Sequence, residues 1–339
     1  MAHYRHWLFY LSAHMFFRFV CFILVVSPFG LMSDQSSKCN TGKLPAWVHI
    51  VPVETGAKPS QNNMHYLLID SQRHWEEKTL YRHLAVKALT QTGIEKISQI
   101  RIDFDPAYYQ VMVHAIRIFR EGEWFDRLQS TRHHLVQRET ELERNIYNGT
   151  LSLVYFLDDV RVGDIVEYSY SLVGGNSLFF SHYTDWVYLQ IDFPVDRIVH
   201  RILGHPDLAL SIKPVHTTID PQIRDLSPTV REWFWEAVDT LPYSYESGQP
   251  IWYRPYAHVE MSQYKTWDEI AQKFYPLYAL SLDFSQSVPS EMQAVVDQWK
   301  QSSACSLKRA LQALRFVQDE IRYLGIEEGM GLFNPRILD

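Results

Sequence analysis

Two stretches in which apolar and polar side chains alternate constrain the fold of this chain more than any other feature. In the first, IVEYSYSL at 165–172, large apolar side chains occupy the even positions, and glutamate or serine occupies the odd positions from 167 on. The second, WVYLQIDF at 186–193, keeps its aliphatic residues and its phenylalanine on one face. A period of two residues predicts strands that bury one side and expose the other.

Turn signals divide the region from about 64 to 220 into many short strands. AIRIFREGEWFDRL at 115–128 is typical of a β-hairpin whose turn carries Glu121-Gly122-Glu123. DDVRVGD at 158–164 is typical of a tight connection, in which Gly163 gives the backbone its freedom. We therefore expect a mainly β fold of antiparallel, β-sandwich-like sheets, followed by a short α-helical segment.

Three amphipathic segments predict helices after the strands. Thr266-Trp267-Asp268-Glu269 is a capping box at the start of the first helix, and Pro276 is expected to bend or end that helix. Ser290-x-x-Gln293 is a second capping box. The third helix is expected from about 304 to 322. Its apolar stripe consists of Leu307, Ala310, Leu311, Leu314, Val317 and Ile321.

An apolar run close to the N-terminus indicates export. Residues 15–32 read MFFRFVCFILVVSPFGLM, with Arg5 ahead of the run and Arg18 inside it. The uninterrupted part, 19–26, is short for a membrane span and typical of a signal-peptide core. We expect residues 1–32 to be either a cleaved signal peptide or a retained anchor that would hold the chain to a membrane.

The charge balance excludes one large class of partner. The 339 residues carry 32 Lys and Arg against 39 Asp and Glu, a net charge of −7. Nucleic-acid binding needs a basic face, so we expect no nucleic-acid partner. The 20 Tyr, 18 Phe and 10 Trp residues are then better explained by β-rich packing than by a surface that stacks on bases or sugars.

These features divide the chain into five expected parts. They are a signal peptide or membrane anchor at 1–32, a linker at 33–63, a β-sandwich-like module at 64–220, a second β region with a connecting helix at 221–290, and the start of a further domain at 291–339.

The three cysteines give no firm active site. Cys21 lies in the apolar run, which leaves Cys39 and Cys305 as the one pair for a disulfide, and nothing in the sequence supports that pair. Cys305 is expected at the start of the third helix, where a thiol pKa is lowered and a nucleophile is conceivable. The last histidine, His258, precedes it by far. We favour a buried or partly buried, inert Cys305.

The remaining polar candidates are explained without a metal or a cofactor. His133 and His134 would point to opposite faces of a strand, so surface histidines are the better interpretation. Asp158, Asp159 and Asp164 crowd a turn and lack the spacing of a calcium loop. No pair of cysteines has the spacing of a zinc site. We expect no metal-binding and no cofactor-binding residue.

Four stretches are most informative when they are taken together. They are GIEKISQIRIDFDPAYYQVMVHAIRIFREGEW at 93–124, VRVGDIVEYSYSLVGGNSLF at 160–179, VEMSQYKTWDEIAQKFYPLY at 259–278 and FVQDEIRYLGIEEGMGLFNPR at 316–336. In this order they resemble DUF3857, a bacterial β-domain without assigned function, and its connection to a transglutaminase-like domain. The resemblance covers about residues 60–339.

This resemblance implies where the chemistry of such proteins lies. A Gly-Asp-Cys-Lys type motif follows the glycine-rich turn in the family, and a histidine and an aspartate follow later. A thiolate attacks a carbonyl, the imidazole moves the proton and the acid orients the imidazole. All three positions would fall after Asp339, so the expectation is a chain truncated before its catalytic motif, with no catalytic residue of its own.

Three hypotheses for function follow. The first is a non-catalytic, exported β-rich module of a truncated transglutaminase-like protein, located in the bacterial periplasm or at the cytoplasmic membrane. The second is an envelope binding module for a peptide, glycan or protein. Its motivation is a group of aromatic residues: Trp233, Trp235, Tyr243, Tyr245, Trp252, Tyr253 and Tyr256. For this group too, core packing is the commoner explanation. The third is half of a split cysteine peptidase or transamidase.

Overall fold

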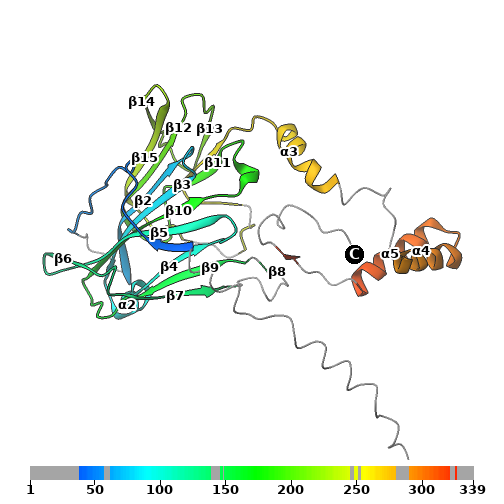
Figure 1. Ribbon diagram of the computed structural model, residues 1–339, viewed down its shortest axis with the longest axis horizontal. Coiled ribbons are helices and arrows are strands. Elements are labelled where there is room, and N and C mark those ends of the chain that lie inside the picture. The colour runs from blue at the N-terminus through cyan, green and yellow to red at the C-terminus, as the bar shows by residue number, and fades with distance from the viewer. Residues whose placement is uncertain are drawn as a thin grey trace, which may run out of the picture. The chain divides into compact units, whose positions relative to one another are not determined.

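The computed structural model describes residues 38–56, 62–138, 146–147, 149–244, 248–250, 253–279, 290–320 and 325–326. The strands from β1 to β16, apart from the short β8, gather in one body, and the longer helices follow them in the chain (Figure 1). The expected mainly β fold is confirmed.

Nine strands of the described residues form one large sheet. Its order is β1-β5-β10-β3-β2-β12-β15-β14, with β6 paired to β5. The bounds are β1 Cys39–Thr41, β2 Met64–His74, β3 Thr79–Ala88, β5 Tyr109–Arg120, β6 Glu123–Asp126, β10 Ile165–Gly174, β12 Val195–Gly204, β14 Gln222–Ser227 and β15 Val230–Thr240. Neighbours are antiparallel except for the parallel pairs β1–β5 and β2–β12. The expected boundary at 220/221 falls between β12 and β14, which belong to this same sheet.

Two small sheets cover one face of the large sheet. One has the order β4-β9-β7, with β4 at Gln99–Phe104, β9 at Leu151–Phe156 and β7 at Arg132–Gln137. The other has the order β11-β16-β13, with β11 at Thr184–Tyr188, β16 at His258–Ser262 and β13 at Ser211–Val215. Each closes a hydrophobic core against the large sheet. The two cores lie on the same face, because Tyr168, Leu84, Ile69, Ile198 and Ala237 are partners in adjacent strands.

The opposite face of the large sheet is also covered, which corrects one expectation. Val51 and Val53 of the segment before β2 pack there against Leu68 and Ile165. The odd positions of β10, which alternation assigned to solvent, are therefore buried: Glu167, Ser169 and Ser171 are nearly inaccessible. When both faces of a strand are covered, the polar side chains of an alternating sequence are buried as well. They are tolerated only if they form hydrogen bonds or ion pairs.

The predicted turns are confirmed. Glu121 and Gly122 connect β5 to β6 with φ of 51° and 90°. A positive φ at both central residues matches the twist of a hairpin, and glycine adopts it without strain. Gly163 has a φ of 95° in the connection before β10. The second alternating stretch is a strand only to Tyr188, although Leu189 remains buried beyond its end.

The helices begin near the expected residues. α2 is Gln91–Ile97, α3 is Trp267–Ala279, α4 is Ser290–Ser302 and α5 is Ser306–Asp319; a 3-10 turn, η3, is Ser177–Phe179. Glu269 donates its backbone N–H to Thr266 Oγ1 at 3.3 Å and accepts from the Lys265 N–H at 2.9 Å, so the predicted cap forms. Of the two effects expected of Pro276, a bend or an end of the helix, the end is not found at that residue, because α3 continues to Ala279.

Some expectations concern residues outside the described ranges. These are the apolar run 15–32 and the glycine-rich turn after 326. The short strands β8, Ile146–Tyr147, and β17, Gly325–Ile326, pair in parallel. Of the described helices, none is long and apolar enough to cross a membrane.

Candidate functional site

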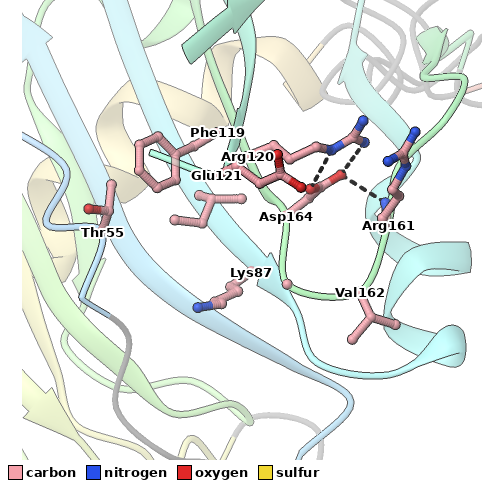
Figure 2. A pocket seen from close by; sticks show the side chains of 10 residues that line it. Thr55, Lys87, Phe119, Arg120, Glu121, Arg161, Val162 and Asp164 are labelled. Atoms are coloured by element: carbon pink, nitrogen blue, oxygen red, sulfur yellow. Dashed lines mark hydrogen bonds and ion pairs between the residues drawn. The ribbon is translucent and has the colours of Figure 1, made fainter. Parts of the chain in front are cut away.

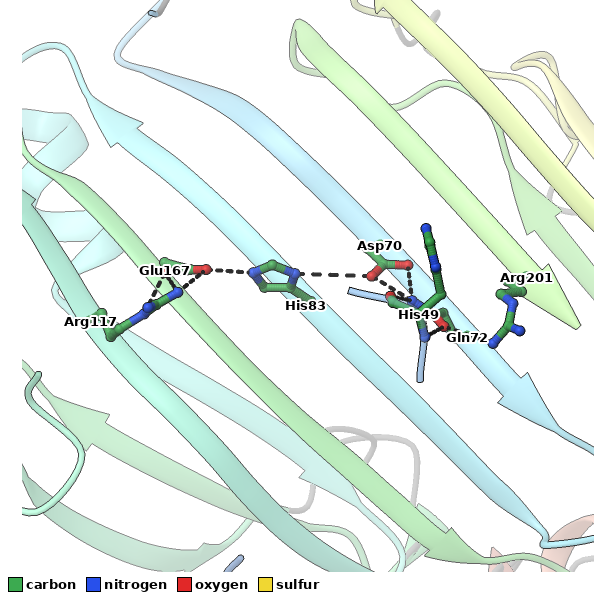
Figure 3. A network of polar contacts seen from close by, with 7 residues as sticks. All are labelled: His49, Asp70, Gln72, His83, Arg117, Glu167 and Arg201. Atoms are coloured by element: carbon green, nitrogen blue, oxygen red, sulfur yellow. Dashed lines mark hydrogen bonds and ion pairs between the residues drawn. The ribbon is translucent and has the colours of Figure 1, made fainter. Parts of the chain in front are cut away.

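A row of charged and polar side chains crosses the large sheet on the face that Val51 covers. We call it the polar ladder; its central part is drawn in Figure 3. Its members, strand by strand from β5 to β14, are Arg117, Glu167, His83, Asp70, Gln72, Arg201, Glu232 and Arg224.

Strand register brings this row together from residues far apart in the sequence. Arg117 is the β5 partner of Glu167, and His83 of β3 is the partner of Asp70. Gln72, two residues after Asp70, lies opposite Arg201 of β12. Because side chains two apart on a strand share a face, these partners all project to the same side.

One half of the ladder surrounds an imidazole with acids. Arg117 Nε donates to Glu167 Oε2 at 2.8 Å, and His83 Nε2 lies 2.8 Å from Glu167 Oε1. The other ring nitrogen, Nδ1, lies 4.0 Å from Asp70 Oδ2. Burial alone would raise the pKa of Glu167, but the hydrogen bonds from His83 and Arg117 outweigh it and leave that pKa lowered.

The other half holds a second pair of opposite charges. Gln72 Nε2 donates to Asp70 Oδ2 at 2.9 Å, and Arg201 Nε donates to Glu232 Oε1 at 2.6 Å. Arg224 Nε donates to the remaining oxygen of Glu232 at 2.9 Å. Asp70 is fully buried, and this burial raises its pKa to about 6 against the lowering effects of Gln72 and the nearby cations.

The backbone of residues 47–49 covers the side chains of the polar ladder. The N–H of His49 donates to Gln72 Oε1 at 2.9 Å, and Gln72 Nε2 donates back to the carbonyl of His49 at 2.6 Å. Arg201 also donates to the carbonyl of Trp47 at 2.7 Å. The ladder is thus a covered set of mutually satisfied groups, and its chemistry is to fix strand register and the course of residues 47–51.

A pocket of about 260 Å³ lies on the same face, near the turn that precedes β10 (Figure 2). Arg120 Nε donates to Asp164 Oδ1 at 2.9 Å, and the Arg161 N–H donates to Asp164 Oδ2 at 2.8 Å. Hydrogen bonds from Arg161 and Arg120 hold the pKa of Asp159 at about 2. The acids Asp159 and Asp164 of this turn are therefore neutralised by arginines, as ordinary turn chemistry would have it.

The two cysteines in the described ranges are both free thiols. Cys39 is half-buried, and burial raises its pKa to about 11. Cys305 caps the start of α5, as expected, but it is exposed, so the expectation of a buried thiol is wrong. The backbone N–H groups of Lys308 and Leu307 lower its pKa. Cys305 is exposed together with its helix, because no residue of α5 is buried.

The histidine and aromatic candidates divide between surface and core. His133 and His134 are exposed on β7, as predicted, and their rings contact Tyr155 and Phe156 on the neighbouring strand. Within the described part of the chain, no three histidine, cysteine or acidic residues could hold a metal ion.

Trp233 and Trp235 are buried in the core, whereas Tyr253 is exposed. Trp252 and Tyr245 lie outside the described residues. The aromatic group named from the sequence is therefore not one surface, and its two tryptophans on β15 confirm the core interpretation.

The polar ladder was not predicted from the sequence. The sequence does contain a signal for buried charges, because the acids Glu167 and Asp70 lie within long, largely apolar strands, β10 and β2. The basic residues His83 and Arg117 lie on the strands β3 and β5, which neighbour them in the sheet. These residues are far apart in the sequence, however, and their contacts cannot be predicted without knowing the order of the strands in the sheet.

The fold and its closed ladder define a β-domain built on one large mixed sheet. Residues 76–244 match the sequence profile of DUF3857, a domain of unknown function with a solved structure. The chain belongs to this family, as the resemblance of 160–179 and its neighbours predicted. No curated protein matches the sequence.

Two solved structures that align with this chain differ widely in how well they match it. A protein from Parabacteroides distasonis, described as a proposed protease, aligns with a TM-score of 0.63 and 14% identity over 81% of this chain and 54% of its own. The present chain thus spans about half of that protein, and the likeness concerns the fold alone. A yeast LTA4 hydrolase in complex with bestatin aligns with a TM-score of 0.28 and 9% identity over 58% of this chain and 28% of its own, which carries no argument.

Proposed function

We propose that this chain is the non-catalytic, β-rich module of an exported bacterial protein of the transglutaminase-like, papain-like thiol class. In this role it supports a catalytic domain whose cysteine, histidine and aspartate lie on residues other than these 339. Residues 1–32 direct it to the periplasm or hold it at the cytoplasmic membrane.

The proposal rests on one observation: the buried titratable groups of the large sheet bond to one another. Catalysis by a histidine requires one ring nitrogen to reach the reacting group. Both ring nitrogens of His83 instead face carboxylates, at 2.8 Å and 4.0 Å, beneath the segment that contains His49. His114, another ring beside a hydroxyl, lies 2.8 Å from Ser171 Oγ, but Ser171 is buried. The buried groups among them, His83 with its two carboxylates and Ser171, hold the sheet together and are closed to a substrate.

The likeness to the Parabacteroides protein supports the same role. That protein is described as a proposed protease, and the aligned part is 54% of its length. A β-module that accompanies a separate catalytic region is consistent with this coverage, and the resemblance of 316–336 to the opening of a transglutaminase-like domain points to the same class.

An activity assay on the purified chain tests the proposal. We expect no hydrolysis of casein or transfer of amines to it above background, and the same result for Cys305→Ala. Exposed Cys305 should react with iodoacetamide, and a Cys39→Ala variant should leave that labelling unchanged because Cys39 is half-buried. Turnover that disappears in Cys305→Ala would overturn the proposal and restore the split-enzyme hypothesis.

The genomic DNA offers a second test. The proposal predicts that one forward frame after the codon for Asp339, or a neighbouring gene, encodes a Gly-Asp-Cys stretch with a histidine and an aspartate further on. Sequence without such a stretch would leave the chain no catalytic domain to support.

A second candidate function is an envelope binding module for a peptide, glycan or protein. One observation favours it: Trp186, Tyr188 and Tyr256 are only partly buried and contact one another, with centroids of Trp186 and Tyr188 4.2 Å apart. Exposed Arg254 lies 4.1 Å from the Trp186 ring centroid. Such rings with a cation form recognition surfaces.

Calorimetric titration with soluble cell-wall fragments tests the binding role. A joint Tyr253→Ala and Arg254→Ala change should abolish binding of glycan or peptide fragments without lowering the melting temperature, because both side chains are exposed. An equal loss of stability would show that they serve packing instead.

A further inference from the structure

One arginine in the middle of the large sheet has no acidic partner among the residues that the structure describes. Arg82 of β3 lies between Tyr170 of β10 and Ser71 of β2, on the face that carries the two hydrophobic cores. It is half-buried. Across the ranges that the structure describes, no carboxylate pairs with it, whereas other arginines of this sheet, such as Arg201 and Arg117, each hold one. A guanidinium that has lost part of its water is stabilised by an anion.

A cavity adjoins this arginine. We call it the central pocket; its volume is about 260 Å³, and it lies between the large sheet and β11. The residues that matter here are Arg82, Arg73, Asp185, Trp186, Tyr188 and His200. Small-molecule sites occupy about 300–1,000 Å³, so this cavity suits a group the size of one amino-acid residue.

The negative charge in the pocket is already neutralised. Arg73 Nε lies 3.0 Å from Asp185 Oδ2, and the Tyr183 hydroxyl donates to the same oxygen at 3.1 Å. The backbone N–H of Trp186 donates to Asp185 Oδ1 at 2.8 Å. Arg201 also borders the pocket, but its guanidinium pairs with Glu232 in the polar ladder. Among the described residues that line the pocket, Arg82 is therefore the charge without a partner of opposite sign.

The other wall groups are neutral or aromatic. His200 is buried, and burial, together with the charge of Arg82, lowers its pKa to about 4, so it is neutral at pH 7. Its Nε2 lies 2.6 Å from the carbonyl of Tyr188, so this nitrogen carries the proton. Trp186 and Tyr188 supply flat apolar surface on the β11 side. One free positive charge suits a monoanion better than a dianionic phosphate.

We propose that the central pocket binds the carboxylate of a peptide C-terminus, with Arg82 as the carboxylate ligand and Trp186 and Tyr188 against the terminal side chain. A guanidinium can hold both carboxylate oxygens through two parallel N–H donors. The inference rests on the binding role named above as the second candidate function, for which it supplies a ligand class.

Calorimetric titration with matched probes tests this site. N-acetyl-phenylalanine, which has a free carboxylate, is expected to bind, and N-acetyl-phenylalaninamide to bind at least about tenfold more weakly, as the loss of a charged hydrogen bond implies. Arg82→Gln should weaken the acid by at least about tenfold and leave the amide unchanged. Arg101→Gln, an exposed arginine of β4, makes the same change in net charge and should have no effect.

Stability and competition separate the alternatives. Because Arg82 has no acidic partner in the described part of the chain, Arg82→Gln should not lower the melting temperature. If that variant fails to fold, Arg82→Lys should retain the charge and bind the acid with intermediate affinity. An amide that binds as well as the acid, full affinity in both Arg82 variants, or equal competition by inorganic phosphate would overturn the proposal. Tighter binding of free phenylalanine than of its N-acetyl form would overturn the peptide assignment.

The two binding proposals fail in different ways. If the phenylalanine probes do not bind but cell-wall fragments still require Tyr253 and Arg254, the central pocket is refuted and the binding role stands. If neither kind of ligand binds, both fail.

Discussion

Asp70 is a fully buried carboxyl group whose folded-state pKa of about 6 lies above the ordinary value of about 3.9. Between pH 4 and 6 the folded state therefore binds more protons than the unfolded state, so the free energy of unfolding falls as the pH rises through this window. Above pH 6 the ionised group lowers stability by about 2–3 kcal/mol relative to pH 4.

Asp70→Asn should remove this loss. The amide oxygen can still accept from Gln72, while the buried charge disappears. We expect the free energy of unfolding to rise by up to about 3 kcal/mol at pH 7.5 and to change little at pH 4. Urea unfolding at both pH values measures it, with exposed Asp158→Asn as the control. A variant that is less stable than the wild type at pH 7.5 would show that the charge itself stabilises the ladder.

His200 contributes the opposite slope. Its folded-state pKa of about 4 lies below the ordinary value of about 6.5, so the unfolded state binds the extra proton as the pH falls. The free energy of unfolding therefore decreases by about 3 kcal/mol as the pH falls from 6.5 to 4. In the wild type, the free energy of unfolding that His200 removes as the pH falls is largely offset by the free energy that Asp70 adds over the same range.

His200→Gln tests this cancellation. Glutamine can donate to the carbonyl of Tyr188 without titrating. We expect the variant to become more stable relative to pH 7 as the pH falls toward 4, because the Asp70 term is then unopposed; Asp70→Asn should show the reverse slope. The measurement is the urea midpoint at half-unit pH steps. Parallel profiles for the two variants would contradict the assignment of opposite signs.

At the scale of elements, α2 depends on a close backbone contact. The carbonyl of Asn63 accepts from the N–H groups of Leu89 and Thr90 at 2.9 and 3.2 Å, just before the helix. A Cβ on Gly93 would lie 2.0 Å from this same oxygen. Backbone atoms cannot move aside as a flexible side chain can, so only glycine fits here.

Gly93→Ala should therefore destabilise the protein despite the better helix propensity of alanine. We expect a loss of about 2 kcal/mol or more in thermal or urea unfolding. Gly56→Ala is the matched control, because nothing lies within 4 Å of its Cβ position and its φ is not positive. That variant should be neutral or slightly stabilised. Similar losses in both variants would refute the contact as the cause.

The elements also show what sequence patterns can reveal. Alternation located β10 and the buried positions around β11, and glycine placed the turns at 121–122 and 163, because these signals are local. The assignment of Glu167 to solvent was wrong because the segment around Val51, more than 100 residues earlier, covers it. Likewise, the position of Arg82 beside the central pocket could not be predicted without the strand order, which places Tyr170 and Ser71 on either side of it.

At the scale of the whole molecule, the helices after 290 are held far less firmly than the large sheet. The apolar stripe of α5 is largely open to solvent: Leu307, Leu311, Leu314 and Val317 are 47–67% exposed. The helix contacts α4 through the rings of Trp299 and Phe316, 5.5 Å apart, and through a hydrogen bond of 3.0 Å from Ser302 to Gln312. The residues of β10 from Ile165 to Leu172, by contrast, are all buried or half-buried.

Amide hydrogen exchange should separate these two parts of the chain. Few buried apolar contacts permit local opening at low free energy, so we expect amides of 306–319 to exchange at least about a hundredfold faster than those of 165–174. Exchange followed by mass spectrometry on a monomeric sample measures it, and β10 serves as the internal reference. Protection of α5 equal to that of β10 would mean that its stripe is covered in solution. Slowing of α5 on addition of a transglutaminase-like domain, with β10 unchanged, would identify that domain as the partner that covers the stripe, because β10 is already buried or half-buried from Ile165 to Leu172.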